Sequence, residues 1–179
     1  MKLIEPTIEY EDRIRAYRES FLKEGGSMDG CGPLRRYEDI RAWIRFCEDG
    51  KDPDKVPADR VPATQYMYVR ESDGKIVGMI QIRHRFNDYL EKYAGHIGYA
   101  VAPDERRKGY AKEMLREALP LCRGLGLARV LVCCLEDNEG SRRTILANGG
   151  VYESTVHEPK DDVYLERYWI DLGGAGCAG

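Results

Sequence analysis

The sequence predicts an α/β (α+β) fold in which a mixed, mainly antiparallel sheet carries helices on both faces. Three observations support this prediction. Apolar residues repeat with the helical period through the first fifty residues, and the period then changes to that of strands. Two β-rich runs flank Ser72-Asp73-Gly74, which is a hairpin signal. A strand, a helix and a second strand follow over residues 96–135, as in a β-α-β unit.

The first two elements are expected to be amphipathic helices. Thr7 can cap the first helix, which ends at Gly25-Gly26, and its apolar stripe consists of Tyr10, Ile14, Tyr17 and Phe21. The second helix has a stripe of Ile40, Trp43, Ile44 and Cys47. Between them, the run GGSMDGCG lacks the Gly-Lys-Ser/Thr ending of a P-loop, so we expect a flexible connection close to a substrate.

Strands are expected after a proline-rich loop at residues 51–62. The remaining elements, in order, are strands at 64–71, 75–84 and 96–103, a helix from about Gly109, a strand at 128–135, a short helix at 141–148, and strands at 151–156 and 163–172. Pro120 lies inside the longer helix, so we expect a kink or an early end there.

Composition and charge limit the classes of protein. The chain has 179 residues, 42% hydrophobic and 33% charged, so we expect one globular domain over residues 1–172 and a disordered tail at 173–179. No apolar run approaches the roughly 20 residues of a membrane helix, and the first residues lack an apolar leader, so a cytoplasmic location is expected. A net charge of −3 disfavours general nucleic-acid binding. The six cysteines form no C-x-x-C pair, which favours reduced thiols and no metal site.

The junction after the third strand has the strongest chemical pattern. The strand stops at Pro103, and the charged residues 104–108 lead to Gly109, where a helix opens. The first N–H groups of a helix lack partners and carry partial positive charge. Gly109 lets a ligand approach the backbone, Ala111 leaves room, and residues 106–108 add three cations. The pattern indicates a phosphate or pyrophosphate pocket, with a solvated basic turn as the alternative.

Arg106-x-x-Gly109-x-Ala111 resembles the Arg/Gln-x-x-Gly-x-Gly/Ala signature of the GNAT acetyltransferase superfamily. The strand before it reads Gly-Tyr-x-Val-x-Pro, Asn138-x-x-Ser141 opens the next helix, and that helix closes on Gly149-Gly150. The resemblance covers roughly residues 62–170. Within the superfamily, the Ile-Arg-His, Gly-His-Ile-Gly-Tyr and Asn-Gly-Gly runs are similar to a bacterial subgroup known mostly as predicted acetyltransferases.

The resemblance implies an acetyl-CoA site within a central β-α-β cofactor unit. In the family, the strand before the signature pairs with the pantetheine arm at positions that match Tyr99, Ala100 and Val101, and a main-chain N–H polarises the thioester. The pyrophosphate is held by N–H groups of the signature. The implied cofactor-binding residues are Ala100, Val101, Arg106, Arg107, Lys108, Gly109, Tyr110, Ala111, Asn138 and Ser141.

The resemblance also implies direct acetyl transfer to an amine in a ternary complex. An alkylammonium with a pKa of about 10 must lose a proton, so a base is needed. Many family members place a tyrosine acid at the position that Ile145 occupies here, and isoleucine cannot donate a proton. Tyr99, Tyr152, Tyr168 or water could serve instead. The alternative is a CoA-binding or acyl-CoA-binding module with little or no catalysis.

His96, Tyr99 and Glu136 are the candidate catalytic residues. His96 begins the cofactor strand and would titrate in a useful range, with a hydrogen-bonded histidine at a strand end as the alternative. Glu136 ends the neighbouring strand and could attract the amine, or it could cap a helix. His84 could face the acceptor or lie in a basic turn.

The expected acceptor is a primary amine of a small molecule or a peptide. Its pocket would be built from the first two helices and from residues 25–32 and 84–93. Four arginines flank the second helix, and they are either solvated or favour an anionic acceptor: Arg35, Arg36, Arg41 and Arg45. A nucleotide-dependent kinase is disfavoured, because neither a P-loop lysine motif nor Gly-x-Gly-x-x-Gly is present. Strand-edge pairing could make a homodimer.

Overall fold

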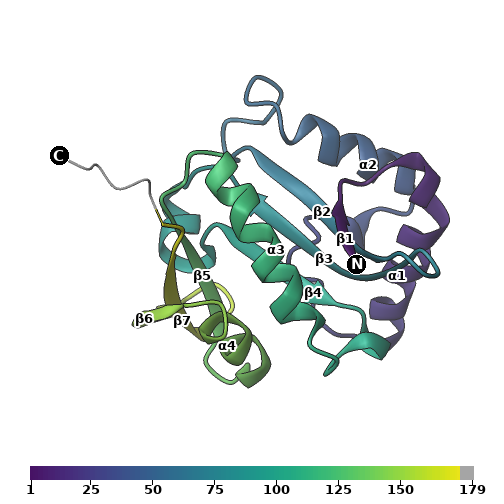
Figure 1. Cartoon of the computed structure of the whole chain (residues 1–179). Helices are drawn as coiled ribbons and strands as arrows, with labels where there is room; N and C mark the ends of the chain where they lie inside the picture. The colour runs from purple at the N-terminus through teal and green to yellow at the C-terminus, as the bar shows by residue number, and fades with distance from the viewer. Residues whose placement is uncertain (174–179) are drawn as a thin grey trace.

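A computed structural model describes residues 1–173 (Figure 1). The strands are β1 (Lys2–Ile4), β2 (Ala63–Arg70), β3 (Lys75–Arg83), β4 (Ile97–Val101), β5 (Arg129–Leu135), β6 (Val151–Glu158) and β7 (Val163–Asp171). They form one sheet in the order β1-β2-β3-β4-β5-β7-β6, and all neighbours are antiparallel except the parallel pair β4 and β5. The predicted mixed, mainly antiparallel sheet is confirmed. The short β1 was not predicted, and residues 174–179 of the expected tail lie outside the described residues.

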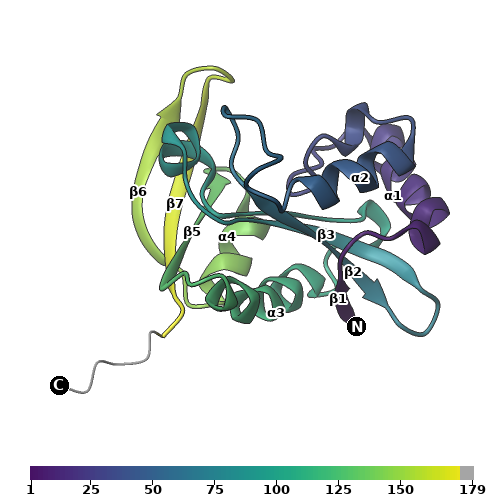
Figure 2. The same ribbon diagram turned by 90° about the horizontal axis from the view of Figure 1, so that it is seen from above.

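Helices cover both faces of the sheet, as expected (Figure 2). One face carries α1 (Glu11–Glu24) and α2 (Ile40–Asp49), and the other carries α3 (Tyr110–Gly124) and α4 (Glu139–Leu146). Short turns connect them: 3-10 turns at Ile8–Tyr10, Leu34–Arg36 and Pro103–Glu105, and a π-helical turn at Leu90–Ala94. Among the described residues, no helix is long and apolar enough to cross a membrane.

The predicted apolar stripes form the core under α1 and α2. α1 buries Ile14, Tyr17 and Phe21, and it ends at Gly25, whose φ of 84° is the left-handed conformation that glycine tolerates. α2 buries Ile40, Trp43 and Cys47 against the same face of the sheet. The helix α1 begins later than expected, because Thr7 precedes the 3-10 turn and makes no side-chain cap.

The core on the other face explains why α3 continues past Pro120. The helix runs on to Gly124, so the expected early end is wrong. Pro120 itself is exposed, whereas Met114, Ala118 and Cys122 on the opposite side of the helix are fully buried. Burial of that apolar stripe offsets the hydrogen bond that proline removes.

The parallel strands β4 and β5 at the centre of the sheet are paired over only a short length. β4 and β5 share a single register pair, Ile97 with Val132, and their parallel pairing does not continue beyond it in the described residues. On their outer sides β4 pairs with β3 and β5 pairs with β7, but within residues 1–173 the edges of β4 and β5 that face each other after Ile97 have no strand partner. The sheet therefore opens into a cleft at its middle.

Candidate active site

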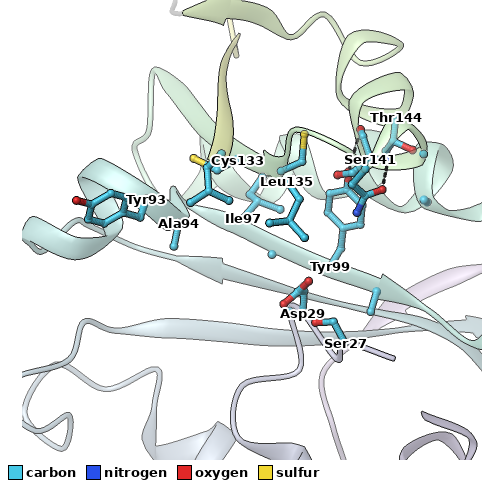
Figure 3. A pocket seen from close by; sticks show the side chains of 18 of the residues that line it. Ser27, Asp29, Tyr93, Ala94, Ile97, Tyr99, Cys133, Leu135, Ser141 and Thr144 are labelled. Carbon is cyan, nitrogen blue, oxygen red and sulfur yellow. Dashed lines mark hydrogen bonds between the residues drawn. The ribbon is translucent and has the colours of Figure 1, made fainter. Parts of the chain in front are cut away.

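The cleft between β4 and β5 has a volume of about 770 Å³ and reaches from one face of the sheet to the other. On the α3 and α4 side it is lined by Tyr99, Ala111 and Ser141, and on the α1 and α2 side by the glycine-rich loop (residues 25–32) and Arg83. Figure 3 shows the ring of Tyr99 pointing toward Ser141 and Thr144, whereas Asp29 enters from the glycine-rich loop on the other side.

The edge of β4 that faces the cleft exposes main-chain groups. On the other edge, Arg83 donates its N–H to the His96 carbonyl at 2.8 Å, and Ala102 donates to the Val77 carbonyl at 2.9 Å. Because bonded pairs alternate along an antiparallel ladder, Tyr99 and Val101 turn their N–H and C=O groups toward the cleft. Ala100 lines the cleft with its side chain, while its carbonyl accepts a hydrogen bond from the Tyr17 hydroxyl at 3.0 Å.

The signature loop (residues 106–111) follows β4 and presents unpaired amides. In the described part of the chain, the N–H groups of residues 107–111 donate no hydrogen bond. Arg107 and Gly109 have φ values of 63° and 86°, and Gly109 is the N-cap residue of α3. Successive N–H groups in such a conformation at a helix N-terminus are of the type that can bind an anion. A Cβ on Gly109 would meet no atom within 4 Å, so glycine is needed there for its φ alone.

Two of the three signature-loop cations are already paired. Lys108 donates to the Glu105 carboxylate at 2.8 Å, and Arg106 donates to Glu24 at 2.8 Å while it lies 5.6 Å from the centre of the Phe21 ring. Within residues 1–173, only Arg107 of the three forms no ion pair. The expected pocket is therefore built mainly from backbone N–H groups, with less side-chain charge than the sequence indicated.

Glu105 fastens the signature loop to the sheet, which sequence reasoning missed. Its carboxylate is buried and accepts hydrogen bonds from Arg70, Lys75 and Lys108 at 2.8–3.2 Å. These bonds, Lys108 first and then Lys75, lower the pKa of Glu105 to about 2. Burial alone would have raised that pKa, so the effect of the three cations outweighs the effect of burial.

We expect Glu105→Gln to lower the free energy of unfolding by about 2 kcal/mol at pH 7, because charge-assisted bonds to three cations are weakened. The depressed pKa means that this stabilisation is present above the unfolded pKa and is lost as the pH falls through about 2. Urea unfolding of both proteins at pH 7 and pH 3 should show the difference shrinking. A difference that stays constant with pH would contradict this role.

Near α4, where Ile145 occupies the position of the expected tyrosine, Tyr99, Ser141 and Asn138 are linked by hydrogen bonds. The Tyr99 and Ser141 hydroxyls are 2.8 Å apart, and Asn138 Oδ1 caps α4 by accepting the Ser141 N–H at 3.0 Å. Burial raises the pKa of Tyr99 well above its ordinary value, so the phenol stays protonated. Ile145 is completely buried in the core beneath α4. Tyr152 and Tyr168 do not line the cleft.

Neither histidine predicted to lie near the acceptor lines the cleft: His96 is buried and His84 is half-buried. His96 is 5% exposed, its Nδ1 accepts the Leu131 N–H at 3.0 Å, and its ring centre lies 3.9 Å from that of Phe86. Burial lowers the pKa of His96 to about 4. His84 Nε2 lies 2.8 Å from the Thr64 hydroxyl, and neither histidine lines the cleft. The arrangement of His96 is the hydrogen-bonded histidine at a strand end that was the alternative to a catalytic base, whereas His84 lies neither at the cleft nor fully at the surface.

Glu136 lies on the exposed turn after β5, outside the set of residues that line the cleft. Its N–H donates to the Tyr164 carbonyl at 3.1 Å, and its own carbonyl accepts from Arg142. Of the predicted cofactor residues, those that line the cleft are Ala100, Val101, Arg106, Ala111, Asn138 and Ser141. Arg107, Lys108, Gly109 and Tyr110 follow on the signature loop beside it.

Asp29 is the carboxylate that the sequence analysis did not single out. Its neighbour Gly30 packs so tightly on β4 that a Cβ there would stand 2.1 Å from the Gly98 carbonyl oxygen. The Gln65 amide donates to the Gly30 carbonyl at 2.8 Å, and Cys31 is fully buried. The glycine-rich loop is therefore anchored instead of being a loose connection. The Asp29 carboxylate lines the cleft and has no hydrogen bond or ion pair within the described residues.

A second cavity of about 870 Å³ adjoins the cleft on the α2 side and shares Asp29, Arg83 and Tyr89 with it. It lies where the sequence analysis expected the acceptor pocket. Arg35 and Arg36 line it, whereas Arg41 pairs with Glu11 and Arg45 lies 3.8 Å from Asp39, outside the cavity. Over residues 1–173, no group of three or more His, Cys, Asp or Glu side chains could hold a metal ion.

Comparisons with known proteins bear on the family and the fold of the chain. A family model described as the acetyltransferase (GNAT) family matches residues 34–149. No curated protein matches the chain significantly. Similar solved structures include a ribosomal-protein-S5-alanine acetyltransferase from Vibrio fischeri, which is 14% identical with a TM-score of 0.73 and covers 97% of this chain and 94% of its own.

Two further structures share the fold at low identity. A spermidine N-acetyltransferase mutant from Vibrio cholerae is 13% identical, with a TM-score of 0.64 over 96% of this chain and 95% of its own. A microcin C7 self-immunity acetyltransferase in complex with acetyl-CoA and AMP is 18% identical, with a TM-score of 0.63 over 94% of this chain and 92% of its own.

Proposed function

Because this chain belongs to the acetyltransferase (GNAT) family, we propose that it transfers an acetyl group from acetyl-CoA to a primary amine of a small molecule or peptide. One observation carries the proposal. The unpaired edge of β4 leads directly into five consecutive amides, those of residues 107–111, that have no hydrogen-bond partner within the described chain. An extended arm ending in a diphosphate would satisfy both sets of groups at once.

The residues present fit CoA along this path. The main-chain groups of Tyr99 and Val101 would pair with the amide-bearing pantetheine arm, and the amides of residues 107–111 would bind the pyrophosphate. Ala111 lines the cleft at the first turn of α3, where its small side chain leaves space. Acetyl-CoA supplies the activated acetyl group, and the residues of this chain supply position and proton transfer.

We assign the two proton-transfer roles to groups on opposite sides of β4. The Asp29 carboxylate binds the incoming ammonium and takes its proton, since it faces the cleft with no protein partner in the described residues. The Tyr99 hydroxyl, held by Ser141, donates a proton to the leaving sulfur in place of the residue missing at Ile145. Its raised pKa keeps that proton available at neutral pH.

The decisive test fills the cofactor path without disturbing the backbone. Ala111→Trp should weaken CoA binding at least about 10-fold and reduce thiol release from acetyl-CoA in proportion, because the indole occupies the cleft. Lys112→Trp is the matched control, since Lys112 is exposed on the same helical turn and does not line the cleft. Calorimetry measures binding, and a thiol reagent measures turnover with a panel of amines. Equal CoA affinity in both variants would place the cofactor elsewhere.

A CoA-binding module with little catalysis is the second candidate, and the observation that favours it is the buried Ile145. The same assay separates the two. Tight CoA binding without thiol release on any amine of the panel supports the module. Amine-dependent release that also requires Tyr99 supports the enzyme.

A further inference from the structure

We propose that the acceptor is an amino acid or a similarly small amine that carries a carboxylate, and that Arg83 binds this carboxylate while Asp29 binds the amine. The inference rests on the proposed acetyltransferase function and specifies its substrate class. It starts from Arg83, which lines both cavities and forms no ion pair with a carboxylate of the described residues.

Within residues 1–173, the Arg83 guanidinium is held by hydrogen bonds from one of its three nitrogen atoms. Nη1 donates to the carbonyls of Ala94 and Gly95 at 3.2 and 3.1 Å. Nε and Nη2 donate no hydrogen bond in the described part of the chain, and no carboxylate there lies within 4.0 Å of the guanidinium. The two carbonyls thus orient the guanidinium and leave one edge, Nε with Nη2, available.

The available edge suits a carboxylate better than any other common group. A guanidinium edge presents two parallel N–H donors that match the two oxygens of a carboxylate. Arg83 is half-buried, and burial lowers its pKa more than the nearby Cys133 and Asp29 raise it, so its positive charge is only partly compensated. A ligand carboxylate would complete that compensation, so the site favours an anionic group from the acceptor.

The position of Arg83 places the acceptor carboxylate close to the amine that would react at Asp29. Its Nη2 lies 3.4 Å from the point that a Cβ on Gly98 would occupy, directly over β4 and one residue before Tyr99. Gly30, next to Asp29, packs against the same Gly98. A molecule with an ammonium at Asp29 and a carboxylate at Arg83 therefore lies across the place where the acetyl group would emerge.

The charged side chains that line the second cavity also favour an acceptor that carries a carboxylate. The second cavity is lined by more cations than carboxylates: Arg35, Arg36, Lys55, Arg60 and Arg83 against Asp29, Asp49 and Asp59. Lys55 and Asp49 neutralise each other at 2.9 Å. A polyamine, the substrate named for one structural neighbour, would bring several positive charges to this positive wall.

The experiment compares matched acceptors that differ only in the carboxylate. Free amino acids, their amides, their decarboxylated amines and spermidine are tested with acetyl-CoA, by thiol release and by calorimetric binding to the CoA complex. We expect amino acids to exceed their amides at least about 10-fold in kcat/KM and in affinity. Arg83→Met should erase this difference, mainly by raising KM, and leave CoA affinity unchanged. Arg83→Lys should restore only part of it.

Arg45→Met is the matched control, because it removes one charge from an exposed arginine of the same half of the molecule that lies outside both cavities. Thermal unfolding checks that each variant is folded. The inference is overturned if amides or spermidine bind and react as well as amino acids, or if Arg83→Met lowers turnover of amides and acids equally. Failure of CoA itself to bind would instead refute the proposed function.

Discussion

Asp29→Asn is expected to lower kcat at pH 7 by about 10²- to 10⁴-fold, while CoA affinity and the unfolding temperature stay close to those of the original protein. The side chain keeps its size but loses the charge that binds the ammonium and the lone pair that takes its proton. Since the carboxylate makes no hydrogen bond or ion pair with the described residues, its loss costs little stability.

The pH dependence of the Asp29→Asn variant separates proton transfer from simple attraction. Without a base, only the free-amine fraction of the acceptor reacts, so the rate should rise about tenfold per pH unit below the acceptor's pKa of about 10. Tyr99→Phe supplies the contrast, because it removes the proposed acid and leaves the base: its kcat falls without this steep rise. If Asp29→Asn keeps within about threefold of the original kcat at pH 7, Asp29 is not the base.

The part of the site that could be predicted from sequence consists of residues that lie close together along the chain. Arg106-x-x-Gly109-x-Ala111 follows a strand and opens a helix in the structure as in the prediction, and Asn138 caps the next helix through Ser141. These features depend on residues within a few positions of one another. The amphipathic stripes of α1 and α2 were predictable for the same reason.

The acceptor side could not be predicted, because its geometry depends on contacts between distant segments. Asp29 acquires its place only when Gly30 meets Gly98 on β4, 68 positions later in the chain. Arg83 is oriented by carbonyls of the π-helical turn, an element with no strong sequence signal. In the sequence Glu105 is one charge among several in a polar loop, yet in the structure it is buried beneath three cations from two strands and the signature loop.

The small residues of the glycine-rich loop suggest flexibility in the sequence, whereas in the structure Gly30 serves close packing. Gly30 has a φ of 71° and no room for a side chain, and Gly98 leaves space for both Gly30 and the Arg83 guanidinium. A glycine that permits contact and a glycine that permits motion look the same in a sequence. Only the neighbour that it meets distinguishes them.

Gly30→Ala is accordingly expected to lower the free energy of unfolding by about 2–4 kcal/mol and to reduce turnover at least about 10²-fold. The new methyl group would stand 2.1–2.4 Å from the backbone of Gly98 and Tyr99, so the glycine-rich loop must move off β4 and carry Asp29 away from the amine. Urea unfolding and thiol release measure the two effects.

Gly25→Ala isolates the contribution of backbone strain to this result. Gly25 has a similar φ of 84°, lies in the same loop, and a Cβ there would meet nothing within 4 Å. It should cost about 1 kcal/mol of stability, the usual penalty for a left-handed alanine, with turnover nearly unchanged. The excess loss in Gly30→Ala therefore measures the close contact between the loop and β4. Equal losses in the two variants would mean that this contact does not position Asp29.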